Sequence, residues 1–245
     1  MPTTAVLEKL HLAHASHIPF ENLDILLGKP ILLDLHSLQA KLVQAQRGGY
    51  CFEQNTLFAG VLQEIGFEVA RLSARVRLGA THLLPRTHML LRVDADGFSW
   101  LADVGFGGEG LLLPLSLVEG TENRQYDSRY RLVRERDLWV LQSFHVGSWQ
   151  DMYAFTLEPQ FDVDFDLANY WTSTHPSSIF VKTLTVQLPT PETRHVLRGH
   201  KLSLIRGETV SVQEIGDDEV LLKVLREVFG LSFPQGTRFN SSAYH

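Results

Sequence analysis

The spacing of apolar residues changes once along this chain, near Glu68, and that change restricts the possible folds more than any other feature. Before it, apolar residues recur every three or four positions, which is the spacing of amphipathic helices. After it, short segments rich in β-branched and aromatic residues alternate with Gly, Asp, Asn or Pro, which is typical of antiparallel strands. The sequence therefore predicts a helical N-terminal part followed by a barrel or sandwich of short strands.

Local signals predict where the helices and strands lie. The first expected helix ends before Pro19 and has the apolar residues Val6, Leu7, Leu10 and Ala13, and the second spans Leu38–Ala45 with Ser37 as its cap. The third begins near Cys51 and ends at Gly66, and its apolar stripe is Leu57, Phe58, Val61, Leu62 and Ile65. The fourth runs from Asp218 to Phe229, and Gly230 ends it. The expected strands lie in 71–78, 88–93, 98–104, 129–133, 138–144 and 151–157, with another pair in 201–215. The softest boundary is Gln187–Arg194, which contains two prolines.

Composition excludes several classes of protein. Among 245 residues, 22 are Lys or Arg and 28 are Asp or Glu, and the resulting net charge of −6 disfavours binding to nucleic acid. A single cysteine excludes an internal disulfide and a zinc site built on several thiolates, and we expect no metal. No apolar run has the length of a membrane span and the N-terminus lacks a signal-peptide pattern, so we expect a cytoplasmic protein without membrane contact.

That cysteine, Cys51, lies where negative charge on sulfur is favoured. Gly48 and Gly49 precede it and allow a tight turn into the third predicted helix. In the first turn of a helix, unpaired N–H groups and the helix dipole stabilise an anion, and the thiolate is the nucleophilic form of cysteine. The same N–H groups would lie near an oxyanion formed on an acyl group bound to the sulfur. The alternative is a buried structural cysteine beside a turn that packs two helices.

The segment His88–Asp103 predicts a hairpin that brings a base to an acid. If its turn is symmetric about the Ala95–Asp96 bond, opposed residues have numbers that sum to 191, and His88 faces Asp103. Apolar residues fill the other face of this hairpin, which supports the register. Such a carboxylate orients the imidazole and stabilises its charged form, as the general base for a cysteine requires. The alternative is a structural His–Asp pair in the wall of a barrel.

Taken together, Cys51, His88 and Asp103 predict acyl transfer through a thioester on the cysteine. The glycine-rich loop Gly105–Gly108 follows and allows a ligand to approach the backbone, although it matches no known phosphate-binding pattern. Phe106 lies in this loop and Phe20 follows the first predicted helix. Each of the two rings could line a ligand site, and the alternative is that it belongs to the hydrophobic core.

Five segments of the chain resemble the arylamine N-acetyltransferases. They are IPFENLDILLG, RGGYCFEQN, THMLL, LADVGFGG and YWTSTHPSSIF, and the match runs from about Leu7 to Phe233. The resemblance implies an α+β fold with an N-terminal helical bundle over 1–66, a central antiparallel β-barrel over 67–186 and a small C-terminal α/β lid over 187–245. It also implies a cysteine-protease-like triad of Cys51, His88 and Asp103.

The resemblance further implies acetyl-coenzyme A as donor and an arylamine, arylhydrazine or hydrazide as acceptor, with an acetyl-cysteine intermediate. The residues that it implies for the acceptor pocket are Phe20, Thr87 and Phe106, and those near coenzyme A are Gly107 and Thr190. Two features depart from the family pattern. The turn that normally reads Thr-Pro-Asp-Gly is Thr190-Pro191-Glu192-Thr193, and the loop Gly79–Thr87 is short, which predicts an open acceptor cleft.

Because the chain is acidic, the phosphates of coenzyme A need a local basic patch, for which the candidates are Lys182, Arg194, Arg198 and Lys201. Other functions stay open at this point. A thiol hydrolase or transglutaminase-like enzyme has Cys, His and Asp in the same chain order, and differs in its acceptor. An amide synthase would use the same triad on a carrier-bound acyl chain. A binding module for aromatic ligands would leave Cys51 unreactive towards iodoacetamide. The sequence does not define an oligomeric state.

Overall fold

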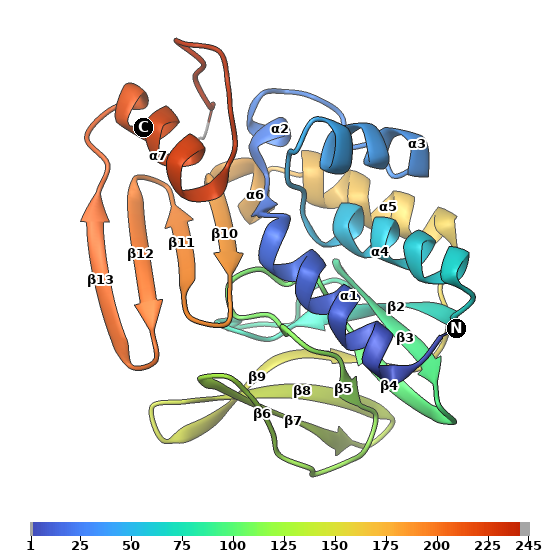
Figure 1. The fold of residues 1–245 in the computed structure, drawn as a ribbon. Coiled ribbons are helices and arrows are strands. Elements are labelled where there is room, and N and C mark those ends of the chain that lie inside the picture. The colour runs from blue at the N-terminus through green and yellow to red at the C-terminus, as the bar shows by residue number, and fades with distance from the viewer. Residues whose placement is uncertain (1, 241–245) are drawn as a thin grey trace.

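A layer of helices, a curled eight-stranded sheet and a separate five-stranded sheet make up the computed structural model, which describes residues 2–240 (Figure 1). This confirms the predicted α+β class with helices first and an antiparallel barrel second. Met1 and residues 241–245, which the predicted domains 1–66 and 187–245 include, lie outside the described residues. The domain boundaries at 66/67 and 186/187 stay predictions.

The helical layer combines segments from two parts of the chain. Its members are α1 (Thr4–His17), α2 (Leu23–Leu26), α3 (Leu35–Leu38), the π-helical turn η1 (Gln39–Gln44), α4 (Cys51–Ile65), α5 (Asp162–Thr174) and α6 (Ile179–Lys182). As predicted, α1 ends ahead of Pro19, and α4 ends at Gly66, whose φ of 102° is one that glycine adopts without strain. Helix α5 was not among the predicted helices, and it packs on α4 through contact between Phe165 and Phe52.

Two details of the predicted helices are wrong. The second helix begins at Leu35 rather than Leu38, because the Asp34 carboxylate accepts the backbone N–H of Ser37 at 2.9 Å and so caps it. Ser37 is therefore inside the first turn and is not the cap. In α4, Leu57, Phe58 and Leu62 of the predicted stripe are buried, but Val61 and Ile65 are exposed, so the buried face is narrower than predicted.

The larger sheet is antiparallel throughout and curls into a barrel (Figure 1). Its strands in spatial order are β5 (Leu115–Ser116), β4 (Phe98–Ala102), β3 (His88–Ala95), β2 (Glu68–Val76), β9 (Ser148–Phe155), β8 (Leu138–His145), β7 (Ser128–Glu135) and β6 (Asn123–Gln125). Between the two end strands, the Gln125 amide oxygen accepts the N–H groups of Leu112 and Leu113, both at 3.0 Å. These bonds link the segment before β5 to the opposite edge of the sheet.

The β3–β4 hairpin has a register two residues away from the predicted one. Leu91 pairs with Ala102, so opposed residue numbers sum to 193 rather than 191. The turn is Asp96-Gly97, whose positive φ values of 50° and 80° suit a two-residue hairpin loop. A shift of two residues leaves every side chain on its predicted face, because side chains alternate along a strand with a period of two. His88 and Asp103 therefore still share a face.

The smaller sheet joins the two ends of the chain. Its strands in spatial order are β1 (Phe20–Glu21), β10 (Thr185–Pro189), β11 (Arg194–Arg198), β12 (Lys201–Arg206) and β13 (Thr209–Glu214), and α7 (Asp218–Phe229) packs on it. The segment that looked like a soft boundary forms the end of β10 and its turn into β11. Among residues 2–240, no helix combines the length and the hydropathy needed to cross a bilayer.

Candidate active site

The start of α4 places Cys51 against the residue that precedes β3. Cys51 is the first residue of α4, is buried, and its Sγ lies 3.6 Å from the carbonyl oxygen of Thr87. A Cβ atom at Gly48 would lie 2.1 Å from the carbonyl oxygen of Pro19, so only glycine fits there. Gly48 thus lets the chain pass Pro19 and β1 closely, and Gly49 leaves room for the Glu53 side chain, which a Cβ atom there would meet at 2.8 Å.

His88 and Asp103 form the hydrogen bond that the hairpin predicts. His88 Nε2 lies 2.7 Å from Asp103 Oδ2, and both side chains are buried. Burial lowers the pKa of His88, but the Asp103 carboxylate and the nearby Cys51 outweigh that effect and raise the pKa to about 10. Burial opposes ionisation of Asp103 as well, and the charge of His88 nevertheless holds the pKa of that carboxyl below its usual value. The geometry favours an imidazolium beside the sulfur.

Two further side chains hold Asp103, and neither was among the residues predicted from the sequence. The Asn55 Nδ2 donates to Asp103 Oδ1 at 3.0 Å, and the Asp103 backbone N–H donates to His11 Nε2 at 3.1 Å. The other ring nitrogen of His11 bonds the carbonyl of Leu112 at 3.0 Å. Asn55 lies four residues after Cys51 and thus on the same helix face, a signal that the sequence contained. The contact of His11 spans 92 residues and leaves no local signal.

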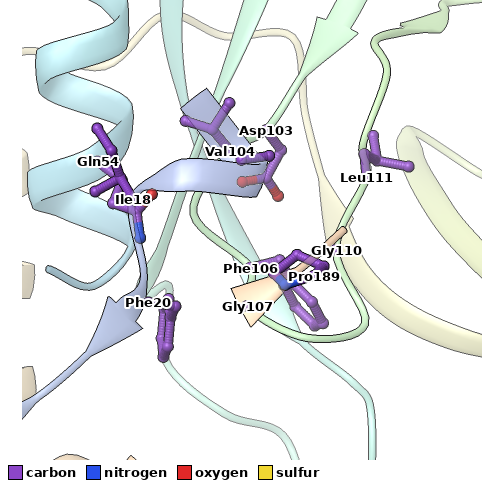
Figure 2. Close-up of a pocket in the computed structure, with 11 residues that line it drawn as sticks. Ile18, Phe20, Gln54, Asp103, Val104, Phe106, Gly107, Gly110, Leu111 and Pro189 are labelled. Atoms are coloured by element: carbon purple, nitrogen blue, oxygen red, sulfur yellow. The ribbon is translucent and has the colours of Figure 1, made fainter. Parts of the chain in front are cut away.

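Aromatic rings enclose the imidazole. The ring centroids of Phe106 and Tyr153 lie 5.2 Å and 4.9 Å from that of His88. Figure 2 shows a small cavity beside Asp103 that Phe20, Phe106 and Gly107 line, together with Gln54, Pro189 and other residues. The structure thus brings together two of the predicted acceptor-pocket residues and Gly107, which was predicted to contact coenzyme A, while Thr87 contacts Cys51 through its carbonyl.

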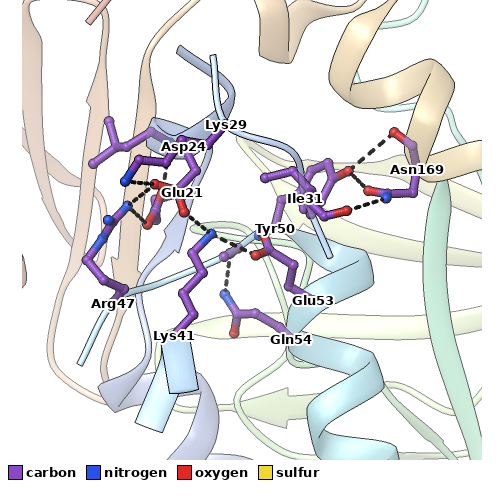
Figure 3. Close-up of polar contacts among 12 residues, drawn as sticks. Glu21, Asp24, Lys29, Ile31, Lys41, Arg47, Tyr50, Glu53, Gln54 and Asn169 are labelled. Carbon is purple, nitrogen blue, oxygen red and sulfur yellow. Dashed lines mark hydrogen bonds and ion pairs between the residues drawn. The ribbon is translucent and has the colours of Figure 1, made fainter. Parts of the chain in front are cut away.

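A buried ionic network fixes the backbone just before Cys51 (Figure 3). The Glu53 carboxylate accepts the N–H of Tyr50 at 3.1 Å and bonds Lys41 Nζ at 2.7 Å, and Lys41 also contacts Asp24 at 2.9 Å. Burial raises the pKa of Glu53 to about 7, although the positive charge of Lys41 opposes that rise. The network continues through Arg47, which lies 2.7 Å from a Glu21 oxygen and 3.2 Å from an Asp24 oxygen.

Only some of the residues predicted to contact coenzyme A lie at the cavity or have free polar groups. Gly107 lies at the cavity, whereas the hydroxyl of Thr190 bonds its own turn, where it accepts the N–H of Thr193 at 3.0 Å. Arg194 has its guanidinium occupied by backbone carbonyls and hydroxyls, and Lys201 is exposed and pairs with Glu214 at 3.3 Å. The four basic candidates therefore do not form one free patch. In the described part of the chain, no group of three or more His, Cys, Asp or Glu side chains is arranged to hold a metal ion.

Comparison with known proteins defines the class. A model of the N-acetyltransferase family matches residues 3–237. The chain is 42% identical over 240 residues to the arylamine N-acetyltransferase / N-hydroxyarylamine O-acetyltransferase of Salmonella typhimurium, covering 94% of this chain and 83% of that protein. It is 43% identical over 234 residues to the arylamine N-acetyltransferase of Escherichia coli, covering 92% and 81%.

Solved structures agree. The M. smegmatis arylamine N-acetyltransferase superposes with a TM-score of 0.91 at 40% identity, covering 94% of this chain and 86% of that one. The Mycobacterium marinum enzyme in complex with CoA superposes with a TM-score of 0.89 at 36% identity, covering 94% and 87%. The chain belongs to the arylamine N-acetyltransferase family, which confirms the resemblance noted in the sequence, and it is an acyltransferase.

Proposed function

We propose that this enzyme acetylates arylamines, arylhydrazines or hydrazides from acetyl-coenzyme A, with Cys51 as nucleophile, His88 as general base and acid, and Asp103 as the group that orients His88. The observation that carries the proposal is the buried 2.7 Å bond between His88 and Asp103 beside a cysteine that begins a helix. The names of the relatives, and the CoA bound to one of them, support the donor and the acceptor class.

The first half-reaction loads the enzyme. Cys51 and His88 rest as a thiolate–imidazolium pair, and the thiolate attacks the carbonyl carbon of the acetyl thioester. The backbone N–H groups at the start of α4 face the developing oxyanion. The bond from the acetyl carbon to the sulfur of coenzyme A then breaks, and coenzyme A leaves as a thiol with the proton from His88. Acetyl-Cys51 remains.

The second half-reaction unloads it. The amine nitrogen attacks the acetyl carbon, His88 accepts the amine proton, and the carbon–sulfur bond to Cys51 breaks to release the N-acetyl product. Cys51 leaves as a thiolate beside the protonated His88, which restores the starting pair and closes the cycle. Phe20, Thr87 and Phe106 would contact the acceptor, and Gly107 and Thr190 the coenzyme A. Such a sequence predicts double-displacement kinetics, with parallel rather than intersecting rate lines.

Intact-protein mass spectrometry after brief mixing with acetyl-coenzyme A, without an amine, tests the proposal. One added acetyl group that maps to Cys51, and that an added arylamine or hydrazide removes, is the expected result. A folded protein without added mass would contradict acetyl transfer and favour the amide synthase that the sequence left open. Release of the acetyl group to water or to protein lysines would favour the hydrolase or transglutaminase-like alternative, and a cysteine inert to iodoacetamide would favour a binding module.

Asp103 provides the sharpest single substitution. An Asp103→Asn protein should fold but should acetylate Cys51 about a thousandfold more slowly, because the amide no longer stabilises the charged imidazole. The measurement is the single-turnover rate of acetyl loading, with Asp137→Asn in an exposed turn as the matched control. Unchanged loading in the Asp103→Asn protein would remove Asp103 from the mechanism.

A further inference from the structure

One arginine of the C-terminal sheet connects three parts of the molecule. Arg194 begins β11, and its guanidinium donates to the carbonyl oxygens of Gly108 and Gly110, the latter at 3.2 Å. It also donates to the hydroxyl oxygens of Ser128 and Tyr130 at 2.9 Å and 3.0 Å. All of these acceptors are neutral oxygens that lie on the glycine loop or on β7. The side chain therefore binds the loop to both sheets.

The neighbouring strand holds the same loop from its other side. The Gln187 amide oxygen in β10 accepts the N–H of Gly108 at 2.5 Å, and its Nε2 donates to Thr185 Oγ1 at 2.9 Å. A Cβ atom at Gly107, whose φ is 92°, would lie 2.7 Å from that same Gln187 oxygen. The loop thus has no room to move towards β10. The hydrogen bonds of Arg194 link the same loop to β7 of the barrel.

The loop reaches the reacting groups at its first residues. The Gly105 N–H donates to Asp103 Oδ1 at 3.0 Å, and the Phe106 ring packs edge-on against the His88 ring with 5.2 Å between centroids. Phe106 also contacts Tyr153, which closes the other side of His88. A displacement of the loop would therefore move the ring that keeps water from the imidazole and one of the donors that hold Asp103.

We propose that Arg194 is a positioning residue that acts on acetyl loading through the glycine loop and Phe106. The inference rests on the proposed function of Cys51 and His88. It assigns Arg194 a role other than the phosphate binding that its position in the sequence favoured, because its donors are already directed at four protein oxygens. A lysine carries three donors on one atom and cannot reproduce the planar fork of an arginine, so charge alone does not meet the requirement.

The test compares Arg194→Met and Arg194→Lys with Arg206→Met, an exposed arginine on β12 of the same sheet. Single-turnover acetylation of Cys51 is measured against acetyl-coenzyme A concentration and pH, with folding checked by circular dichroism. For Arg194→Met we expect the maximal loading rate to fall about tenfold with little change in the half-saturating concentration. We expect the alkaline limb of the rate profile to move about one pH unit lower, because water that reaches His88 weakens the effect of Asp103. Arg194→Lys should be intermediate and Arg206→Met unchanged.

Three results would overturn the proposal. A higher half-saturating concentration with an unchanged maximal rate would make Arg194 a coenzyme A ligand. A lower unfolding temperature with an unchanged rate and pH profile in the folded protein would make it a structural residue only. Full activity in Arg194→Lys, with loss only in Arg194→Met, would show that charge and not the fork is needed.

Alkylation of Cys51 by iodoacetamide keeps the inference separate from the proposed function, because it needs no acetyl-coenzyme A. If the native protein is not acetylated, the proposed function fails. A several-fold slower alkylation of Arg194→Met at neutral pH would still support positioning of the pair by Arg194, and equal alkylation would refute it.

Discussion

Asn55 uses both ends of its amide to fix the segment that carries Asp103. Its Nδ2 donates to the Met89 carbonyl at 2.7 Å and to Asp103 at 3.0 Å, and its Oδ1 accepts the N–H of Val104 at 3.2 Å. The side chain is fully buried, so no water replaces a lost partner. At the scale of the residue, the geometry of the candidate site depends on a neighbour to which the proposed mechanism gives no chemical step.

Replacing Asn55 by leucine tests this dependence. Asn55→Leu keeps the branching and the number of side-chain heavy atoms but removes one hydrogen bond each from the Met89 carbonyl, the Asp103 carboxylate and the Val104 N–H, so we expect the free energy of unfolding to fall by about 3 kcal/mol. Acetyl loading of the folded protein should also slow, because Asp103 loses a donor. Urea denaturation and single-turnover loading measure the two effects. Gln63→Leu, on the exposed side of the same helix, is the control, and an equal loss there would contradict the argument.

At the scale of the element, close packing and one carboxylate define the residue at which α4 begins. Gly48 lies so close to Pro19 that a Cβ atom would enter backbone rather than a flexible side chain, and the Tyr50 N–H that follows is held by Glu53. The helix therefore begins at one defined residue, and Cys51 occupies its first position. The sequence predicts this start from the paired glycines, but the carboxylate that fixes it is supported by Lys41, which approaches from η1.

A methyl group at Gly48 should disturb that start. For Gly48→Ala we expect the free energy of unfolding to fall by about 3 kcal/mol, because either β1 or the helix must move, and acetyl loading to fall with it. Thermal and urea unfolding provide the measurement. Gly216→Ala is the matched control, since a Cβ atom there meets nothing within 4 Å, and we expect a change below about 1 kcal/mol. Similar losses at both positions would refute close packing as the cause.

At the scale of the whole molecule, two buried groups give stability opposite dependences on pH. Burial lowers the pKa of His11 to about 4, so between pH 4 and 6.5 the unfolded chain binds more protons and stability falls as pH falls. Burial raises the pKa of Glu53 to about 7, so between pH 4.5 and 7 the folded chain binds more protons and stability rises as pH falls. The native protein contains both contributions, and they partly cancel.

Removing His11 should change the slope of this pH dependence, although His14, whose pKa burial lowers to about 3, still opposes Glu53. As the pH falls from 7 to 4.5, the free energy of unfolding should decrease less in His11→Gln than in the native protein, and the difference should be about 2 kcal/mol. The reason is that glutamine does not titrate. Urea denaturation at several pH values between these limits measures the difference. His36→Gln, an exposed histidine, should follow the native profile. If the profile of His11→Gln is parallel to the native one, His11 is not buried as a neutral imidazole.

Local order along the chain was predictable from the sequence. The spacing of apolar residues determined helices first and strands second, Gly66 and Gly230 ended their helices, and the glycine pair placed Cys51 in a first helical turn. The pairing of His88 with Asp103 also followed from the sequence, even with a register wrong by two residues, because alternation keeps both side chains on one face. These features depend on neighbours within one element or one hairpin, where spacing carries the information.

Only the tertiary structure decided which distant side chains complete the site. The bond of His11 to Asp103 spans 92 residues and that of Arg194 to Gly108 spans 86, and β1 near the N-terminus pairs with β10 of the C-terminal sheet. No periodic pattern encodes such contacts, because they depend on how whole layers pack and on which buried polar atoms then need partners. The sequence by itself thus determined which cysteine, histidine and aspartate make up the candidate site, whereas the packing of the three layers determined which side chains hold them in place.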